Sequence, residues 1–326
     1  MFNPIQSSQI TFDAHDTAGG DFGDLPNWNL SDLYPTTDGK EISTDLENLE
    51  KNCGSFAADY QGQLDGLTSD GLLNCIERYE DIQNIAGRIM SFAGLRYYQN
   101  TTDSERSKFM ADMQAKITDF TTPLVFFSLE INSIDDKIIK NLLNSNEKLA
   151  RYKPILDNLR KMKPHQLSDE MEQFLHDQSV IGAAAWNRLF DETMAALTFN
   201  IEGEVLNLEA TLNLLSDTNR AIREKGTRAL IKVFGENISL FSRITNTLAK
   251  EKEIEDRWRK MPTPQYGRHL ANQVEPEVVE ALRNAVVAAY PRLSHRYYAL
   301  KAKWMGLETL EVWDRNAPLD GEDSAN

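Results

Sequence analysis

The stretch from Glu275 to Pro318, EPEVVEALRNAVVAAYPRLSHRYYALKAKWMGLETLEVWDRNAP, predicts two amphipathic helices followed by a turn. In its first part, apolar residues recur at spacings of three and four, which places them on one face of a helix. These residues are Val278, Val279, Leu282, Val286 and Ala289. Pro291 interrupts the pattern because proline has no backbone N–H and crowds the preceding turn. The pattern then resumes and runs to Trp304, and Gly306 is typical of a helix end. Both predicted helices carry an apolar face that needs a partner surface.

Several sequences in the chain resemble the oligoendopeptidase F family of zinc metallopeptidases, which are relatives of thimet oligopeptidase. Within the stretch above they are LSHRYY, LKAKWMGL and WDRNAP, and LPNWNLSDLYP at 25–35 is similar to the opening signature of the family. Residues 149–175 and 197–215 are similar to its N-terminal domain and to the short hairpin that follows it. The resemblance extends, in family order, from Leu25 to Pro318. It implies a mostly helical peptidase whose deep channel admits short peptides.

The family members are most similar to one another at an HExxH helix, and the chain contains no HExxH sequence. That motif places two imidazoles on one face of a helix and a carboxylate beside the metal-bound water. The resemblance therefore implies the N-terminal half of a zinc metalloendopeptidase, which is inactive by itself and forms one wall of the substrate channel. Zinc is expected in the complete enzyme and not in this chain. The expected partners are short peptides and a missing C-terminal catalytic half.

The composition is that of a globular, acidic and mainly helical protein. The 326 residues are 41% apolar and 26% charged, and they include only 17 glycines and 11 prolines, which favours helices over disorder. Acidic residues outnumber basic ones by 50 to 35, giving a net charge of −15. A protein of that sign repels phosphate backbones and anionic membrane surfaces. We therefore expect neither nucleic acid nor a membrane as a partner.

The first 24 residues have no basic region followed by an apolar run, so they do not resemble a signal peptide and are predicted to form a disordered tail. No apolar run approaches the roughly 20 residues that a membrane-spanning helix needs. Cys53 and Cys75 have no CxxC spacing and are expected to be reduced thiols in the core. Together these features favour a cytoplasmic protein.

Helical periodicity recurs along most of the chain. Apolar stripes predict long helices over 41–60, over 69–98 with Ser69 as N-cap, and from the turn at 100–103 to Phe127, as in a helical bundle or hairpin stack. Further helices are expected at 135–143, 149–162, 168–194, from a cap at Asp217 or Thr218 to Phe234, and on to Lys260. Only residues 197–208 alternate apolar and polar side chains, with Gly203 in the turn. We therefore expect an all-α fold with one small β-hairpin.

The change of period at the hairpin indicates a domain boundary between residues 195 and 216. We predict a helical N-terminal domain over residues 25–195. Residues 196–326 would then be the start of the peptidase domain, truncated before its zinc-binding segment.

One group of side chains has spacings that suggest a metal site. His165, Asp169, Glu172 and His176 recur at intervals of four, three and four, which would align them along one helical stripe. However, Pro164 and the expected cap at Ser168 start the helix after His165 and take that ligand out of line. The favoured interpretation is a solvated helix face with a weak pair between Glu172 and His176.

Five side chains are candidates for lining a substrate channel. Tyr266, Arg268 and His269 lie in a polar and aromatic stretch after two prolines, and such loops often line binding clefts. The alternative is an exposed helix-capping loop. His295 and Tyr298, together with the neighbouring Tyr297, are candidates for facing a peptide. The alternative for the pair Tyr297 and Tyr298 is one core and one rim position, as it is for Tyr97 and Tyr98.

Two functional interpretations remain open from the sequence. The first is part of a zinc metalloendopeptidase, and the second is a non-enzymatic helical protein that binds peptides or acts as a scaffold. A reading frame that continues past Asn326 into an HExxH helix favours the peptidase, whereas a stop codon there favours the scaffold.

Overall fold

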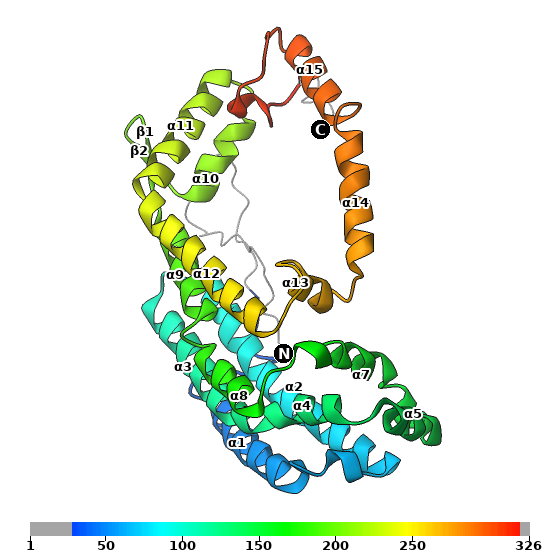
Figure 1. The fold of residues 1–326 in the computed structure, drawn as a ribbon. Coiled ribbons are helices and arrows are strands. Elements are labelled where there is room, and N and C mark those ends of the chain that lie inside the picture. The colour runs from blue at the N-terminus through cyan, green and yellow to red at the C-terminus, as the bar shows by residue number, and fades with distance from the viewer. Residues whose placement is uncertain (1–27, 320–326) are drawn as a thin grey trace. The chain divides into compact units, whose positions relative to one another are not determined.

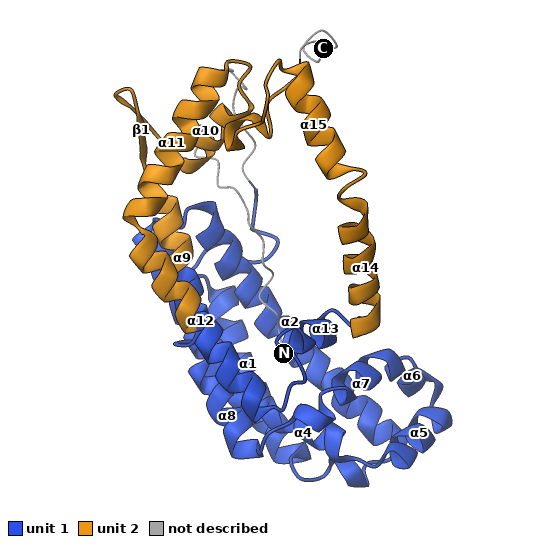
Figure 2. Cartoon of the chain, turned by 45° about the horizontal axis from the view of Figure 1, so that its top comes forward, with its two compact units in different colours: residues 1, 26–188, 248–273 blue, residues 2–25, 189–247, 274–326 orange. Residues whose placement is uncertain are grey.

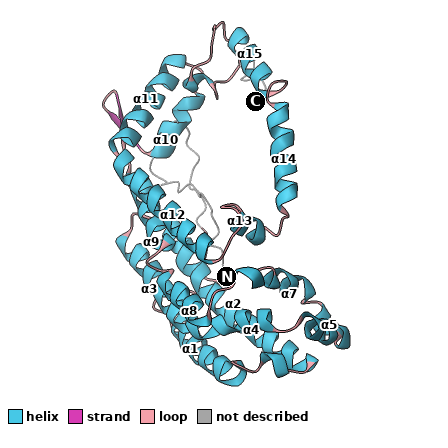
Figure 3. Ribbon diagram, viewed as in Figure 1, coloured by secondary structure: helices cyan, strands magenta, loops and turns pink. Residues whose placement is uncertain are grey.

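The computed structural model describes residues 28–319, and the tail predicted for residues 1–24 lies outside them. Regular structure in the described chain is helical apart from one two-stranded antiparallel sheet (Figures 1 and 3). The predicted fold class, all-α with one small hairpin, is confirmed. None of the helices within residues 28–319 combines the length and the apolar character that crossing a membrane requires.

The chain forms two compact units, which Figure 2 shows in different colours. Among the described residues, unit 1 contains 28–188 and 248–273, and unit 2 contains 189–247 and 274–319. The chain therefore passes from one unit to the other within helix α9 (Ala183–Ala196), within helix α12 (Ile238–Trp258), and again at Gln273. The predicted domain division between residues 195 and 216 stays a prediction.

Unit 1 is built from the helices before residue 189, from the end of α12 and from α13. Its α-helices are α1 (Lys40–Tyr60), α2 (Ser69–Gln99), α3 (Ser104–Thr121), α4 (Val125–Ser133), α5 (Asp136–Ser145), α6 (Glu147–Ala150), α7 (Lys153–Arg160), α8 (Asp169–Gln178) and α13 (Tyr266–Ala271). Three short 3-10 helices lie at Leu64–Gly66, Thr122–Leu124 and Lys163–His165.

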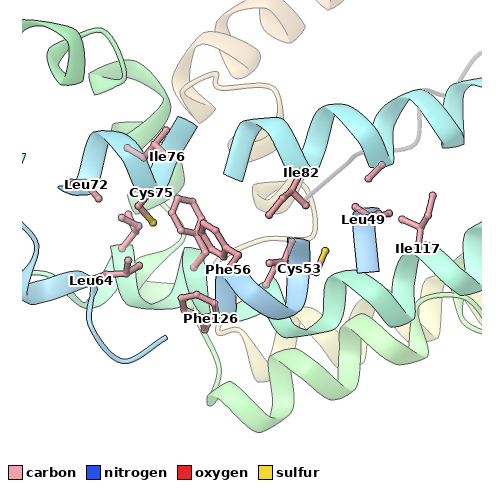
Figure 4. Packing of buried hydrophobic residues seen from close by; sticks show 14 of the residues in the cluster. Leu49, Cys53, Phe56, Leu64, Leu72, Cys75, Ile76, Ile82, Ile117 and Phe126 are labelled. Carbon is pink, nitrogen blue, oxygen red and sulfur yellow. The ribbon is translucent and has the colours of Figure 1, made fainter. Parts of the chain in front are cut away.

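The hydrophobic core of unit 1 lies where α1, α2, α3 and α4 meet (Figure 4). The predicted stripe of α1 is buried at Ile42, Leu49, Cys53 and Phe56. The ring of Phe56 lies 5.8 Å from the ring of Phe126 and 5.9 Å from that of Tyr79. Cys53 and Cys75 are buried free thiols, as predicted, and burial raises the pKa of each to about 12.

Several helices in unit 1 differ from the prediction. The helix expected over 149–162 is two, α6 and α7, separated by a turn at Arg151 and Tyr152. Thr68 and not Ser69 is the N-cap of α2, because its hydroxyl oxygen accepts a hydrogen bond from the N–H of Gly71 at 3.1 Å. The helix expected to reach Phe127 ends at Thr121, because Pro123 lacks the N–H that would continue the hydrogen-bond ladder. The helix expected over 168–194 is two helices, and α9 restarts where Glu251 accepts a hydrogen bond from the N–H of Ala183.

Unit 2 contains the hairpin and the helices that follow it. Its elements are β1 (Phe199–Ile201), β2 (Glu204–Leu206), α10 (Leu208–Asn213), α11 (Arg220–Glu236), α14 (Pro276–Ala289) and α15 (Ser294–Trp304), with 3-10 helices at Leu214–Ser216 and Val312–Asp314. Phe199 pairs with Leu206 across the hairpin, and Gly203 turns it with a φ of 96°. The cap of α11 is Asn219, whose side chain accepts from the N–H of Ala221, and not Asp217 or Thr218.

The two helices of the stretch from Glu275 to Pro318 form as predicted, but α14 has no buried residue. Val278 and Leu282 are 55% and 65% exposed. Helix α15 buries only Lys301 and Ala302, and Gly306 ends it with a φ of 67°, in the left-handed region that favours glycine.

Candidate functional site

The first three channel candidates share one short helix in unit 1. Pro262 and Pro264 precede α13, and its first turn begins with a hydrogen bond from the N–H of Tyr266 to the carbonyl of Thr263. The ring of Tyr266 packs edge-on against that of His165 at 5.3 Å, so this tyrosine is partly buried. Arg268 is exposed and His269 is half-buried, and neither side chain has a hydrogen bond or ion pair within residues 28–319. Tyr266 therefore anchors the helix, while Arg268 and His269 are available to a ligand.

A buried arginine just before α13 fixes this region of unit 1. The side chain of Arg259 is 5% exposed, and its two terminal nitrogens donate to the two carboxylate oxygens of Glu172 at 2.7 and 2.9 Å. Its Nε also donates to Glu255, and its backbone carbonyl accepts a hydrogen bond from Nδ1 of His165 at 2.9 Å. A bidentate pair of this kind is geometrically specific. The end of α12 is thereby held against α8 and the segment before it.

Glu172 and Arg259 each stabilise the ionised form of the other. Burial alone would raise the pKa of Glu172, but hydrogen bonds from Arg259 and from the N–H of Leu167 outweigh it and hold that pKa below its ordinary value. Burial would likewise lower the pKa of Arg259, but the hydrogen bonds to Glu172 and Glu255 raise it. Both groups therefore stay ionised at neutral pH.

The metal site weighed from the sequence does not form among these residues. Glu172 is engaged by Arg259, and Nε2 of His176 lies 3.2 Å from the hydroxyl of Thr121 and 3.3 Å from the carbonyl of Thr118. The predicted pair between Glu172 and His176 is therefore wrong, because both side chains have partners on other helices. In the part of the chain that the structure describes, no group of three His, Cys, Asp or Glu side chains is arranged to hold a metal ion.

The remaining candidates, His295 and Tyr298, lie on α15 in unit 2. His295 is exposed, and its ring lies 6.2 Å from that of Tyr290. Tyr297 and Tyr298 are 45% and 38% exposed, so the alternative of a core and a rim position is wrong for this pair. It is confirmed for Tyr97, which is buried, and Tyr98, which is half-buried.

Tyr298 lines an open hollow of about 560 Å³ between α15 and the segment that follows it. Ala299 and Ala302 line it from the helix, and the opposite wall consists of Glu308, Thr309, Leu310, Glu311, Val312 and Arg315. Apolar and aromatic groups with a few charged ones at the rim are the usual lining of a ligand site.

A buried aspartate holds that opposite wall in place. Asp314 is fully buried and accepts hydrogen bonds from Arg220 at 2.9 Å and from Arg223 at 3.1 Å, two arginines on one face of α11. Burial would raise the pKa of Asp314, but these bonds and one from the N–H of Glu311 hold it below its ordinary value. The buried Lys301 of α15 donates to the carbonyls of Arg315 and Ala317. The segment 311–317 is thus tied to both α11 and α15.

The structure brings the five candidates together only in part. Tyr266, Arg268 and His269 share α13 in unit 1, and His295 and Tyr298 share α15 in unit 2; a channel lined by both sets stays a prediction. Sequence reasoning missed the bidentate Arg259–Glu172 pair and the Asp314 cluster. The sequence WDRNAP contains Asp314, but nothing local points to Arg220, which lies 94 residues earlier.

The comparisons with known proteins agree with one another. The sequence model of the family described as Oligopeptidase F matches residues 130–199. The chain is 24% identical to Oligopeptidase PepF of Bacillus subtilis (strain 168), over 90% of this chain and 44% of that protein. It is also 24% identical to Group B oligopeptidase PepB of Streptococcus agalactiae serotype III (strain NEM316), over 91% of this chain and 49% of that protein.

A solved structure shares the fold. The oligoendopeptidase-F of Enterococcus faecium superposes with a TM-score of 0.76 at 22% identity, over 87% of this chain and 57% of that one. The chain spans about half the length of the curated relatives that it matches. Along nine-tenths of its length the chain is thus similar in sequence to proteins of the oligopeptidase F type, and it shares the fold of a solved oligoendopeptidase-F.

Proposed function

We propose that this chain is the N-terminal portion of a zinc metalloendopeptidase that hydrolyses short peptides, and that it is inactive alone. The observation that carries the proposal is the match along nine-tenths of the chain to proteins named as oligopeptidases, of whose length it covers about half. The role proposed for the chain is that of one wall of the substrate channel. The cytoplasmic location stays a prediction.

The zinc of such an enzyme does not fit the residues described here. Catalytic zinc takes three protein ligands and leaves one position open for water. Residues 28–319 offer no group of that kind, and the nearest donors, Glu172 and His176, are held by Arg259 and Thr121. In the proposal the metal and the general base come from the catalytic half, and this chain binds and orients the peptide.

The proposed wall uses groups that recognise peptides without cleaving them. The exposed guanidinium of Arg268 is suited to a carboxylate or a backbone carbonyl, and the imidazoles of His269 and His295 to backbone groups. The aromatic ring of Tyr298 offers an apolar surface with a hydroxyl at its end. Holding a substrate in place contributes to catalysis because the reacting groups are already close together and correctly oriented, so the reaction no longer depends on a chance encounter.

The proposal also accounts for the exposed apolar face of α14. Val278, Leu282 and Val286 are 55%, 65% and 43% exposed. Apolar burial contributes roughly 25 cal/mol per Å², so leaving about 400 Å² uncovered forfeits on the order of 10 kcal/mol. Patches of that size usually mark an interaction site. In the proposal, part of this face packs against the catalytic half.

The test is reconstitution from two polypeptides. The 326-residue chain and the segment encoded directly downstream of it are expressed separately and then mixed. We expect the chain alone to self-associate or to bind a hydrophobic dye, and the mixture to suppress that signal. We expect cleavage of a quenched fluorescent peptide only in the mixture, lost on chelation and regained with zinc.

The control replaces the glutamate of the downstream HExxH by glutamine, which should abolish cleavage while leaving the suppression of dye binding unchanged. A downstream stop codon, together with a chain that is monodisperse, dye-silent and cooperatively folded, would refute the peptidase proposal. It would favour the alternative, a non-enzymatic helical peptide-binding or scaffold protein.

A further inference from the structure

The charge of the chain is unevenly distributed, and one acid-free segment stands out. Residues 281–307 contain no Asp or Glu, in a protein with a net charge of −15. The same residues contain five basic side chains: Arg283, Arg292, Arg296, Lys301 and Lys303. This segment comprises most of α14 and all of α15. A basic surface on an acidic protein attracts anionic ligands, which the rest of the molecule repels.

Two of these cations lie on the solvent-facing side of α15. Arg296 and Lys303 are seven residues apart, which is nearly two helical turns, so they share one face. Both are exposed, whereas Lys301 and Ala302 on the opposite side are buried. Neither Arg296 nor Lys303 has an ion pair within residues 28–319. Their charge is therefore not compensated by the described part of the chain.

The hollow beside α15 lies next to this cationic face. Ala299 lines the hollow. Viewed down the axis of α15, its position around the helix falls between that of the buried Ala302 and that of the exposed Lys303. Leu310 and Val312 give the hollow apolar walls, and Arg315 lines it as well. Of its two carboxylates, Glu311 accepts a hydrogen bond from the backbone N–H of Asp314, and Glu308 is exposed. An apolar hollow thus borders two uncompensated cations.

We infer that α15 binds an acidic segment of an extended peptide, with two carboxylates three residues apart on Arg296 and Lys303. The separation of seven positions between these cations corresponds to about 10.5 Å along the helix axis. A polyproline II peptide has three residues per turn and rises about 3.1 Å per residue, so its residues i and i+3 share a side at about 9.3 Å. A residue between them then points elsewhere, and an apolar side chain there enters the hollow. The inference rests on the proposed function in taking a peptide as the ligand.

The experiment measures binding of labelled peptides to the whole 326-residue chain by fluorescence anisotropy at low salt. One peptide carries Glu-Pro-Leu-Glu, a second carries the same residues as Glu-Glu-Pro-Leu, and a third carries Gln-Pro-Leu-Gln. Two exposed ion pairs contribute enough for a roughly two- to thirty-fold preference. We expect the first peptide to bind more tightly than the third by that factor. Its preference over the second, which can still form one of the two pairs, should be roughly one- to five-fold, and both preferences should shrink in 0.5 M salt.

Two variants and a control assign the contact. Arg296→Gln and Lys303→Gln should each remove most of the preference for the first peptide. Lys232→Gln changes an exposed lysine on α11 in the same unit and should leave the preference unchanged. Unchanged circular dichroism in all three variants would show that the fold is intact.

The inference would be overturned by equal affinity for the first two peptides, or by a preference that survives both α15 variants. It would also be overturned if the chain sedimented with anionic phospholipid vesicles through Arg296 and Lys303 while ignoring the peptides. The peptide-binding experiment and the reconstitution experiment test different claims, and either can fail without the other. Spacing-dependent binding without zinc-dependent cleavage in the mixture would refute only the proposed peptidase, and cleavage without the spacing preference would refute only this inference.

Discussion

Helices α2 and α14 carry the same kind of sequence pattern and end in opposite environments. Eleven residues of α2 are buried, among them Ile76, Ile89 and Phe92, whereas no residue of α14 is. Both helices form where an apolar period of 3.6 residues predicts them. The period identifies the apolar side of a helix but does not identify what covers it. Helix α2 finds its partners in α1 and α3, and within residues 28–319 the apolar face of α14 finds none.

The largest expected effect tests this difference with one truncation in each region. Phe56→Ala removes a fully buried ring that contacts Tyr79 and Phe126, and it should lower the free energy of unfolding by about 3–5 kcal/mol. Leu282→Ala on α14 removes a side chain that is 65% exposed, and it should change stability by less than about 0.5 kcal/mol. Urea denaturation measures both. A large loss of unfolding free energy in Leu282→Ala would show that the apolar face of α14 is covered in solution. The contrast drawn between α2 and α14 would then be wrong.

The next effect asks whether unit 2 relies on a buried ion cluster where unit 1 relies on a hydrophobic core. Asp314→Ala leaves the buried guanidinium of Arg223 without its carboxylate and should cost about 3 kcal/mol. Glu224→Ala removes a half-buried partner of the exposed Arg228 from the same helix and should cost less than about 1 kcal/mol. Hydrogen exchange in α11 and residues 311–317 would localise the loss. Equal protection in both variants would contradict the role given to Asp314.

Each unit holds a carboxylate whose folded-state pKa is lowered, and each of these carboxylates should lose its contribution to stability in acid. Glu172 in unit 1 and Asp314 in unit 2 contribute stability above their ordinary pKa values of about 4. That contribution is lost as the pH falls through the lowered folded-state values, because the unfolded chain then binds more protons. Unfolding free energies measured between pH 6 and pH 3 should therefore fall. Glu172→Gln should flatten part of this fall, and an unchanged slope would contradict the assignment.

The smallest effect compares two glycines of α11. A Cβ on Gly226 would meet Cβ of Leu214 at 3.1 Å and Cδ1 of Leu215 at 3.3 Å, so Gly226→Ala should cost about 1–2 kcal/mol. A Cβ on Gly235 would meet nothing within 4 Å, so Gly235→Ala should be neutral or stabilise the helix by up to about 1 kcal/mol. Thermal unfolding measures both changes. Equal effects would mean that α11 is not packed closely against the segment around Leu214.

Part of the candidate site could be predicted from the sequence. The sequence indicates Tyr266, Arg268 and His269 as one group, because three residues so close together share a local structure wherever the chain folds. It also indicates His295 and Tyr298, and both are exposed on α15. The pair that holds the end of α12 against α8 could not be predicted, since Arg259 and Glu172 are 87 residues apart and no periodic pattern links them. The acid-free run at 281–307 was visible in the sequence, but the hollow beside it depends on Asp314 binding α11.

The sequence by itself determined the elements that depend on near neighbours. The helical stripes gave α1, α2, α14 and α15, and the alternation at 197–208 gave the only hairpin within residues 28–319. Gly203 and Gly306 have positive φ where the turn and the helix end require it. These features follow from dihedral preferences and side-chain period, which act over a few residues.

Only the tertiary structure decided which faces are covered and which charges meet. The burial of Lys301 against the carbonyls of Arg315 and Ala317, and the pairing of Asp314 with Arg220 and Arg223, both depend on segments beyond the reach of a helical period. A buried charge is tolerated only where its partners are in place, and those partners are positioned by packing and not by spacing along the chain.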